Sequence, residues 1–222
     1  MDFERMREQS GRRIAALGIE GEVPEWLPLL SESDVAYLRP VEQAVARTHA
    51  IAAALAVQEG APAEAVAAEV RRHDLERWLA GPERDVLRHH LGEAPLAGDD
   101  LVIAEANLGW QQECLWALLW ALGIVEELRA DAFCGDASHY RRLSPTGRPG
   151  DTVPGVALRP HEELAAELDF LYCLHWHARE RRLRGHPQVA EDPLREGMVE
   201  ERRRPIEWLF TEEEWEEISL DT

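Results

Sequence analysis

The amino-acid sequence predicts an all-α protein, and three observations lead to that prediction. Several segments place apolar residues three and four positions apart, which is the spacing of one face of an α-helix. No segment alternates apolar and polar residues over a length that would make a strand. Glycine and proline stand between the periodic segments, where helices end and begin. We therefore predict a single-domain helical bundle over residues 1–222.

The N-terminal region is predicted to begin with a helix over residues 2–17. Gly18 follows it in the position of a C-cap glycine. Residues 19–30 contain glycine and two prolines, which favour an extended connection. The sequence Ser-Glu-Ser-Asp at residues 31–34 resembles a helix start, because Ser and Asp cap the free N–H groups of a first turn.

Three further helices are predicted before residue 95. Pro40 can open a helix, since the first turn needs no N–H from that position, and the alanine-rich pattern that follows continues to Val57. Two more periodic segments cover residues 62–79 and 82–91, and glycine and proline separate them.

The clearest helix is predicted from Asp99 or Asp100 to about Leu122. Its main apolar stripe consists of Leu101, Ala104, Leu108, Gln111, Leu115, Leu118 and Leu122. Trp116 and Trp120 occupy a neighbouring face. A helix that is apolar nearly all round is buried among other helices, so we expect this Trp/Leu-rich helix at the centre of the bundle.

The C-terminal third is predicted to contain two helices and two irregular segments. Residues 134–160 are rich in glycine and proline and should be irregular, without forming a domain boundary. Helices are expected over residues 161–183 and from Pro193 to about Phe210. An acidic tail covers residues 211–222.

Charge and cysteine content restrict the class of protein. The net charge is −19 and no lysine is present, which argues against nucleic acid and anionic lipid as partners. The longest uncharged apolar run, residues 114–125, is too short to cross a bilayer. The three cysteines form no CxxC pair and no signal-peptide pattern is present, so we expect a cytoplasmic location.

Sequence motifs predict no cofactor, no metal and no catalytic residue. Phosphate-binding loops, zinc-protease motifs and serine-hydrolase elbows are all missing. The order of His49 and the pair His73-Asp74 resembles the metal site of the HD-domain phosphohydrolases. In that family an apolar run precedes the pair, whereas here it follows the stretch Glu69-Val70-Arg71-Arg72, which is typical of a solvated face. An HD-like metal-dependent hydrolase is therefore the alternative function.

A second group of histidines lies on the predicted helix over residues 161–183. Cys173, His175 and His177 alternate along it, and side chains two positions apart on a helix point in different directions. They cannot chelate one ion together. His175 shares a face with leucines, which is typical of a core histidine.

Several stretches with tryptophan motifs occur together in the chain. The central one contains Trp110, Glu113, Leu115-Trp116 and Leu118-Leu119-Trp120-Ala121-Leu122-Gly123. The others contain Arg13 with Leu17-Gly18-Ile19, Leu27-Pro28, Leu158-Arg159-Pro160, Glu167-Leu168-Asp169, Leu171-Tyr172, Leu174-His175-Trp176, Arg179, Glu201-Arg202-Arg203, Trp208-Leu209, Trp215 and Asp221-Thr222. In this order they resemble a bacterial family catalogued as domain of unknown function 4272, over most of the chain.

The resemblance implies one mainly helical domain and no particular activity. It marks a set of polar positions, which are Glu113, Arg159, Asp169, Tyr172, His175, Arg179, Glu201 and Arg202. In a structural interpretation, Glu113 pairs with an arginine such as Arg179 or Arg202, because a buried carboxylate needs a partner. In a functional interpretation, the set converges on a pocket for a ligand or for acid–base chemistry. We favour the structural interpretation.

The function expected from the sequence is that of an acidic interaction protein without catalysis of its own. One form is an immunity or antitoxin-type protein whose negative surface binds a basic protein partner. The alternatives are the HD-like hydrolase and a small-molecule-binding helical domain with a tryptophan-lined centre.

Overall fold

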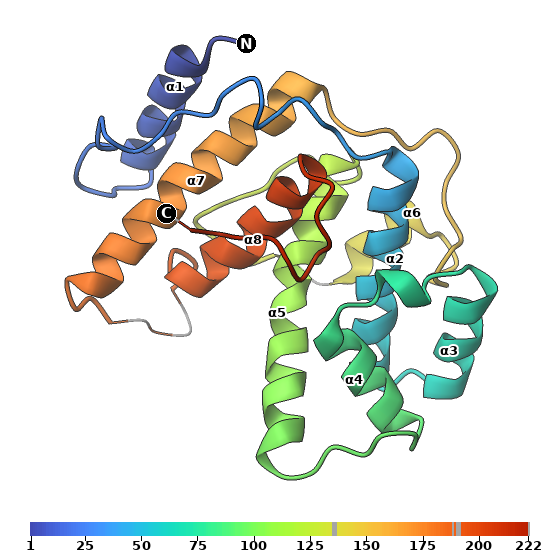
Figure 1. Ribbon diagram of the computed structural model, residues 1–222. Helices are drawn as coiled ribbons and strands as arrows, with labels where there is room; N and C mark the ends of the chain where they lie inside the picture. Colours follow the sequence, from blue (N-terminus) through green and yellow to red (C-terminus); the bar gives the residue numbers. More distant parts are fainter. Residues whose placement is uncertain (135–136, 188, 190–191, 222) are drawn as a thin grey trace. The chain divides into compact units, whose positions relative to one another are not determined.

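A computed structural model describes residues 1–134, 137–187, 189 and 192–221 (Figure 1). Over these residues the protein is built from helices and contains no strand, which confirms the predicted fold class. The chain divides into two compact units. Unit 1 consists of Met1–Arg39, Leu128–Phe133 and Leu158–Thr222, and unit 2 of Pro40–Glu127 and Cys134–Ala157. A single domain over residues 1–222 stays a prediction.

Unit 2 is formed around the alanine-rich helix α2. Its helices are α2 (Val41–Gln58), α3 (Ala63–Arg72), η1 (Glu76–Trp78), α4 (Gly81–His90), α5 (Asp99–Ala121), η2 (Ala137–His139) and α6 (Tyr140–Leu143). Helix α2 packs against α3, α4 and α5. Small side chains such as Ala50 and Ala53 are fully buried, so the neighbouring helices approach its backbone closely.

The helix predicted over residues 62–79 is shorter than expected. It ends at Arg72, and Asp74 adopts a left-handed backbone conformation with a φ of 53°. Aspartate tolerates that conformation better than most residues, but a helix cannot continue through it. The chain then forms only the short 3₁₀ turn η1.

The predicted central helix, α5, is buried along only part of its length. Val102 and Ile103 are 65% and 56% exposed, and Leu108 is the first buried residue of the helix. Trp120 is buried, whereas Trp116 is only half-buried. The periodic pattern shows where apolar residues lie on a helix but not whether another helix packs against them. This explains why the N-terminal end of α5 is exposed although the sequence predicts a buried helix.

The described residues of unit 1 form three helices, and α7 contacts both of the others. They are α1 (Phe3–Ala16), α7 (His161–Leu183) and α8 (Glu196–Leu209), and Figure 1 shows α1 and α8 alongside α7. The helix start predicted at residues 31–34 is wrong. The Asp34 carboxylate accepts hydrogen bonds from the N–H and the hydroxyl of Ser31, which closes an isolated turn instead.

The acidic C-terminal segment is folded back onto unit 1. Trp215 is buried against Trp208, with the two ring centroids 5.5 Å apart, and Ile218 is buried as well. Thr222 lies outside the described residues, as do residues 135–136 of the predicted irregular segment 134–160. Within the described part of that segment, η2 and α6 are helical. No described helix combines the length and the apolar character needed to cross a membrane.

Candidate functional site

Helix α7 brings half of the predicted polar set together. Asp169, Tyr172, His175 and Arg179 follow one another at intervals of three and four residues, so they lie along one side of the helix. Helices α1 and α8 cover much of that side, and their side chains supply the partners.

Asp169 is buried and bound on both carboxylate oxygens. Arg7 on α1 donates to Oδ1 from Nη2 at 2.9 Å and from Nε at 3.1 Å, and the Ser10 hydroxyl donates to Oδ2 at 2.6 Å. Arg7 also donates to the carbonyl oxygens of Leu27 and Pro28. The carboxylate is therefore part of the attachment of α1 and of the segment that follows it.

A second ion pair of the same kind involves Glu167, which lies two residues before Asp169 on α7. Arg13 donates to the two carboxylate oxygens of Glu167 at 2.8 and 3.1 Å, and its guanidinium lies 3.5 Å from the centre of the Phe170 ring. Burial raises the pKa of Glu167, and the Arg13 charge opposes that increase. Burial also raises the pKa of Cys173, so its sulfur stays a thiol and not a nucleophilic thiolate.

His175 is a buried imidazole between two charged residues of α8. Its Nδ1 lies 3.1 Å from Nη1 of Arg203. Because a guanidinium only donates, Nδ1 must accept, and in the neutral ring the proton is on Nε2. Nε2 faces Oε1 of Glu200 at 3.3 Å in a poorly aligned contact. The neighbouring imidazole of His175 lowers the pKa of Glu200.

His175, Glu196 and Glu200 are the described residues that most resemble a metal-binding set. Their potential ligand atoms all lie within 4.8 Å of one another. A metal ion would need the lone pair of Nε2. Because Nδ1 accepts from Arg203, the proton of the neutral ring is on Nε2, and that lone pair is not available. Glu196 is already paired with Arg182. The donor set therefore does not fit a resident metal ion.

A polar cavity of about 390 Å³ lies beside His175. Its lining contains three arginines and three acidic residues, which are Arg179, Arg182, Arg204, Glu196, Glu200 and Asp221. Two of the predicted residues, His175 and Arg179, thus border the same cavity. Glu113, another residue of the predicted polar set, belongs to the other unit.

The remaining predicted residues of unit 1 bind neighbouring protein groups. Arg202 is fully buried and donates to the carbonyl oxygens of Ala130, Ala132 and Pro193. The Arg159 guanidinium is 2.6 Å from the Glu163 carboxylate. Glu201 is half-buried on α8.

In unit 2, Glu113 is buried and accepts a hydrogen bond from the N–H of Cys134 at 2.8 Å. Its pairing with Arg179 or Arg202 would join the two units and stays a prediction. Sequence reasoning missed a fully buried ion pair of this unit, in which Arg47 contacts Glu83 at 2.5 and 2.6 Å. The sequence feature that could have revealed this pair is Arg47 itself, a single arginine within the alanine-rich pattern of α2.

The HD-like histidine set has a different role from the predicted one. His49 is buried, with Nδ1 2.6 Å from the Tyr140 hydroxyl and Nε2 2.7 Å from the Thr152 hydroxyl. Burial lowers the pKa of His49 to about 4. Both ring nitrogens are thus used by the protein, and Asp74 is exposed. This arrangement does not fit a metal site of the HD type.

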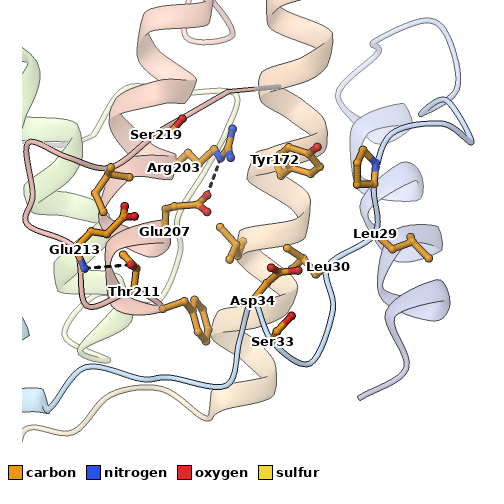
Figure 2. Close-up of a pocket in the computed structure, with 14 residues that line it drawn as sticks. Leu29, Leu30, Ser33, Asp34, Tyr172, Arg203, Glu207, Thr211, Glu213 and Ser219 are labelled. Atoms are coloured by element: carbon orange, nitrogen blue, oxygen red, sulfur yellow. Dashed lines mark hydrogen bonds and ion pairs between the residues drawn. The ribbon is translucent and has the colours of Figure 1, made fainter.

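A second cavity in unit 1, of about 430 Å³, was not predicted from the sequence. Figure 2 shows it between the segment over residues 28–34 on one side and α8 with the segment that follows it on the other. Leu29, Leu30 and Phe210 contribute apolar walls, and Asp34 and Glu213 contribute carboxylates. The sequence feature that could have indicated this cavity is the group of glutamates within residues 212–217.

Tyr172 and Arg203 form the side of this cavity nearest to α7 and α8. The Arg203 guanidinium lies 4.8 Å from the centre of the Tyr172 ring, and the Arg7 guanidinium lies 5.9 Å from it. Arg203 also donates from Nε to the Glu207 carboxylate at 3.0 Å. Tyr172 thus separates two internal ion pairs.

Comparison with known proteins gives one match. A family model described as "Domain of unknown function (DUF4272)" matches residues 6–218. This agrees with the resemblance carried by the tryptophan motifs. No curated protein and no solved structure matches the chain.

Proposed function

Because the chain belongs to the family described as "Domain of unknown function (DUF4272)", whose description assigns no activity, we propose a function from the geometry. The protein is a non-catalytic bacterial interaction protein of the cytoplasm that binds a basic protein partner, in the manner of an immunity or antitoxin-type protein. One observation carries this proposal: the buried carboxylates of α7, Asp169 and Glu167, are bound to internal partners, while a row of glutamates is held at the surface.

The internal partners leave little capacity for acid–base chemistry. Asp169 is bound by Arg7 and Ser10, and Glu167 is bound by Arg13. A general base must reach the proton that it removes, and these carboxylates are buried within ion pairs. Buried and paired charges of this kind support the structural interpretation of the polar set.

The surface glutamates lie on the C-terminal segment. Five of them are exposed there, namely Glu212, Glu213, Glu214, Glu216 and Glu217. Trp215 and Ile218 are buried between and beside them, so the segment is anchored. An anchored acidic surface attracts a basic partner at long range and requires little ordering when the partner binds.

The small-molecule alternative is supported by the cavity beside His175. His175 borders a polar space of about 390 Å³, which has room for a small polar ligand. A ligand screen by thermal shift tests it: stabilisation that is lost in His175→Phe would favour this alternative over the interaction protein.

The proposed function is tested by capturing binding proteins from host extract. The baits are the wild-type protein and two variants of it that each lack five negative charges. The first variant carries glutamine in place of the five glutamates of the C-terminal segment. The second carries the corresponding amides at five exposed acidic positions elsewhere, namely Glu4, Glu25, Glu59, Glu64 and Asp85. We expect the wild-type protein and the second variant to recover the same basic protein from host extract, and the first variant to lose it. Recovery of no basic protein at low salt would contradict the proposal.

A further inference from the structure

We propose that the cavity beside Asp34 and Glu213 is the site where an arginine or lysine side chain of the partner inserts. This inference rests on the proposed function and assigns its contact point. The cavity lies next to the anchored acidic segment, and Glu213 belongs to both. A basic side chain that the acidic surface attracts therefore meets the cavity directly.

The carboxylates around the cavity have unused acceptor oxygens. Asp34 receives hydrogen bonds from Ser31 on Oδ2, and Oδ1 has no partner among the described residues. Glu207 binds Arg203 through Oε2, and within the same part of the chain Oε1 has no partner. The Glu213 carboxylate likewise has no hydrogen-bond or ion-pair partner among the described residues, although its backbone carbonyl is bound by Arg39.

The positive charge in the cavity wall does not compensate these carboxylates. Arg203 is the cationic side chain among the described residues that line the cavity. It already donates to Glu207, to His175 and to the carbonyl oxygen of Leu220. Three carboxylates against one committed guanidinium leave a negative site, which favours a cation and repels a phosphate or a carboxylate.

The apolar part of the lining fits the stem of a long basic side chain. Leu29 and Leu30 border the cavity from the segment over residues 28–34 (Figure 2). Phe210, which follows α8, also belongs to its lining. Arginine and lysine bury their methylene groups against apolar surface while the charged end contacts polar groups. The volume of about 430 Å³ accommodates such a side chain together with part of its backbone.

Both walls are fixed before any partner binds. Arg7 donates to the carbonyl oxygens of Leu27 and Pro28, which holds the segment that leads to Asp34. On the other side, Arg39 donates to the carbonyl oxygens of Trp208 and Glu213. A preorganised site loses less conformational entropy on binding than a flexible one.

The test uses two short peptides that differ in one charge. One is an acetylated, amidated Gly/Ser peptide with a central arginine, and the other has citrulline there, which keeps the shape of arginine but is neutral. Binding to the full chain is measured by isothermal titration calorimetry at low salt. Wild-type protein should bind the arginine peptide about tenfold more tightly than the citrulline peptide.

The protein variants locate the site. Asp34→Asn combined with Glu213→Gln should weaken arginine-peptide binding by about tenfold or more. The control, Glu25→Gln combined with Glu59→Gln, removes the same charge elsewhere and should change binding by less than about twofold. All four residues are exposed, so the melting temperatures should stay close to that of the wild type.

Two results would overturn different conclusions. If both double variants weaken binding equally, the peptide responds to the overall charge and the cavity is not its binding site. The proposed function as an acidic interaction protein would still be supported by that result. If neither the arginine peptide nor any basic protein binds at low salt, the proposed function itself fails.

Discussion

Several charged residues in this protein are buried in complementary pairs, and Arg47 and Glu83 of unit 2 form one that is almost completely enclosed. The side chains of Arg47 and Glu83 are 1% and 0% exposed. Arg47 also donates to the carbonyl oxygen of Trp78, and Glu83 accepts from the N–H of Ala80. The ion pair therefore links α2 to the turn between η1 and α4.

Removal of one partner of this pair should be far more costly than removal of both. Glu83→Ala leaves the Arg47 guanidinium buried without its counter-charge, which should lower the free energy of unfolding by about 3–5 kcal/mol. Arg47→Met combined with Glu83→Leu leaves no buried charge and should cause a clearly smaller loss. Urea denaturation of both variants measures the difference, and equal losses would show that the charges themselves contribute little.

His49 makes the stability of the protein depend on pH. Its pKa is about 4 in the folded protein and about 6.5 in the unfolded chain, so the unfolded state binds the proton more readily between these values. The stability that His49 contributes is present above pH 6.5 and is lost as the pH falls towards 4. The shift corresponds to about 3 kcal/mol.

Comparison with His49→Gln isolates this contribution from that of the other titrating groups. The free energy of unfolding of the wild type should fall more steeply between about pH 6.5 and pH 4 than that of His49→Gln. Parallel curves for the two proteins would mean that His49 takes up its proton equally in both states.

At the scale of the helices, periodicity predicted the elements well because glycine and proline mark their ends. Helix α7 has the predicted bounds, residues 161–183. The failures have local causes: Asp74 adopts a left-handed conformation, and Asp34 closes a turn with its own side chain. Both depend on the conformation of single residues, which the apolar pattern does not report.

Helix α5 shows that the same residue type can differ in burial one turn apart. Trp120 is 5% exposed and lies in the buried part of the helix. Trp116 is half-buried and donates its indole N–H to the carbonyl oxygen of Glu127 at 2.9 Å. The sequence gives no reason to distinguish them, since both lie on the same face.

The two tryptophans should therefore respond differently to truncation. Trp120→Ala leaves a large cavity in the packed region and should lower the free energy of unfolding by about 3–5 kcal/mol. Trp116→Ala removes a ring that is already partly in water and should cost about half as much. Chemical denaturation gives both values; a larger loss for Trp116→Ala would mean that the buried side of α5 is assigned wrongly.

At the scale of the whole molecule, the sequence predicted that buried polar groups are paired but not which groups pair with them. Asp169 and His175 lie in the predicted set, whereas their partners Arg7 and Arg203 were not selected. Arg7 is 162 positions from Asp169 along the chain, and no local pattern connects such distant residues. The cavity at Asp34 was missed for the same reason, because its two walls come from opposite ends of the chain.

The net charge of −19 acts over the whole surface and should determine how fast a basic ligand arrives. Exposed charges are screened beyond the Debye length, which falls from about 20 Å to about 7 Å between roughly 20 and 200 mM salt. The association rate of a fluorescent arginine-rich peptide should therefore fall by about tenfold over this range, while its dissociation rate changes much less. Stopped-flow fluorescence measures both rates, with a citrulline-containing peptide as the uncharged control. An association rate that does not change with salt would mean that the acidic surface does not attract the ligand at long range, and contact chemistry alone would then have to explain binding.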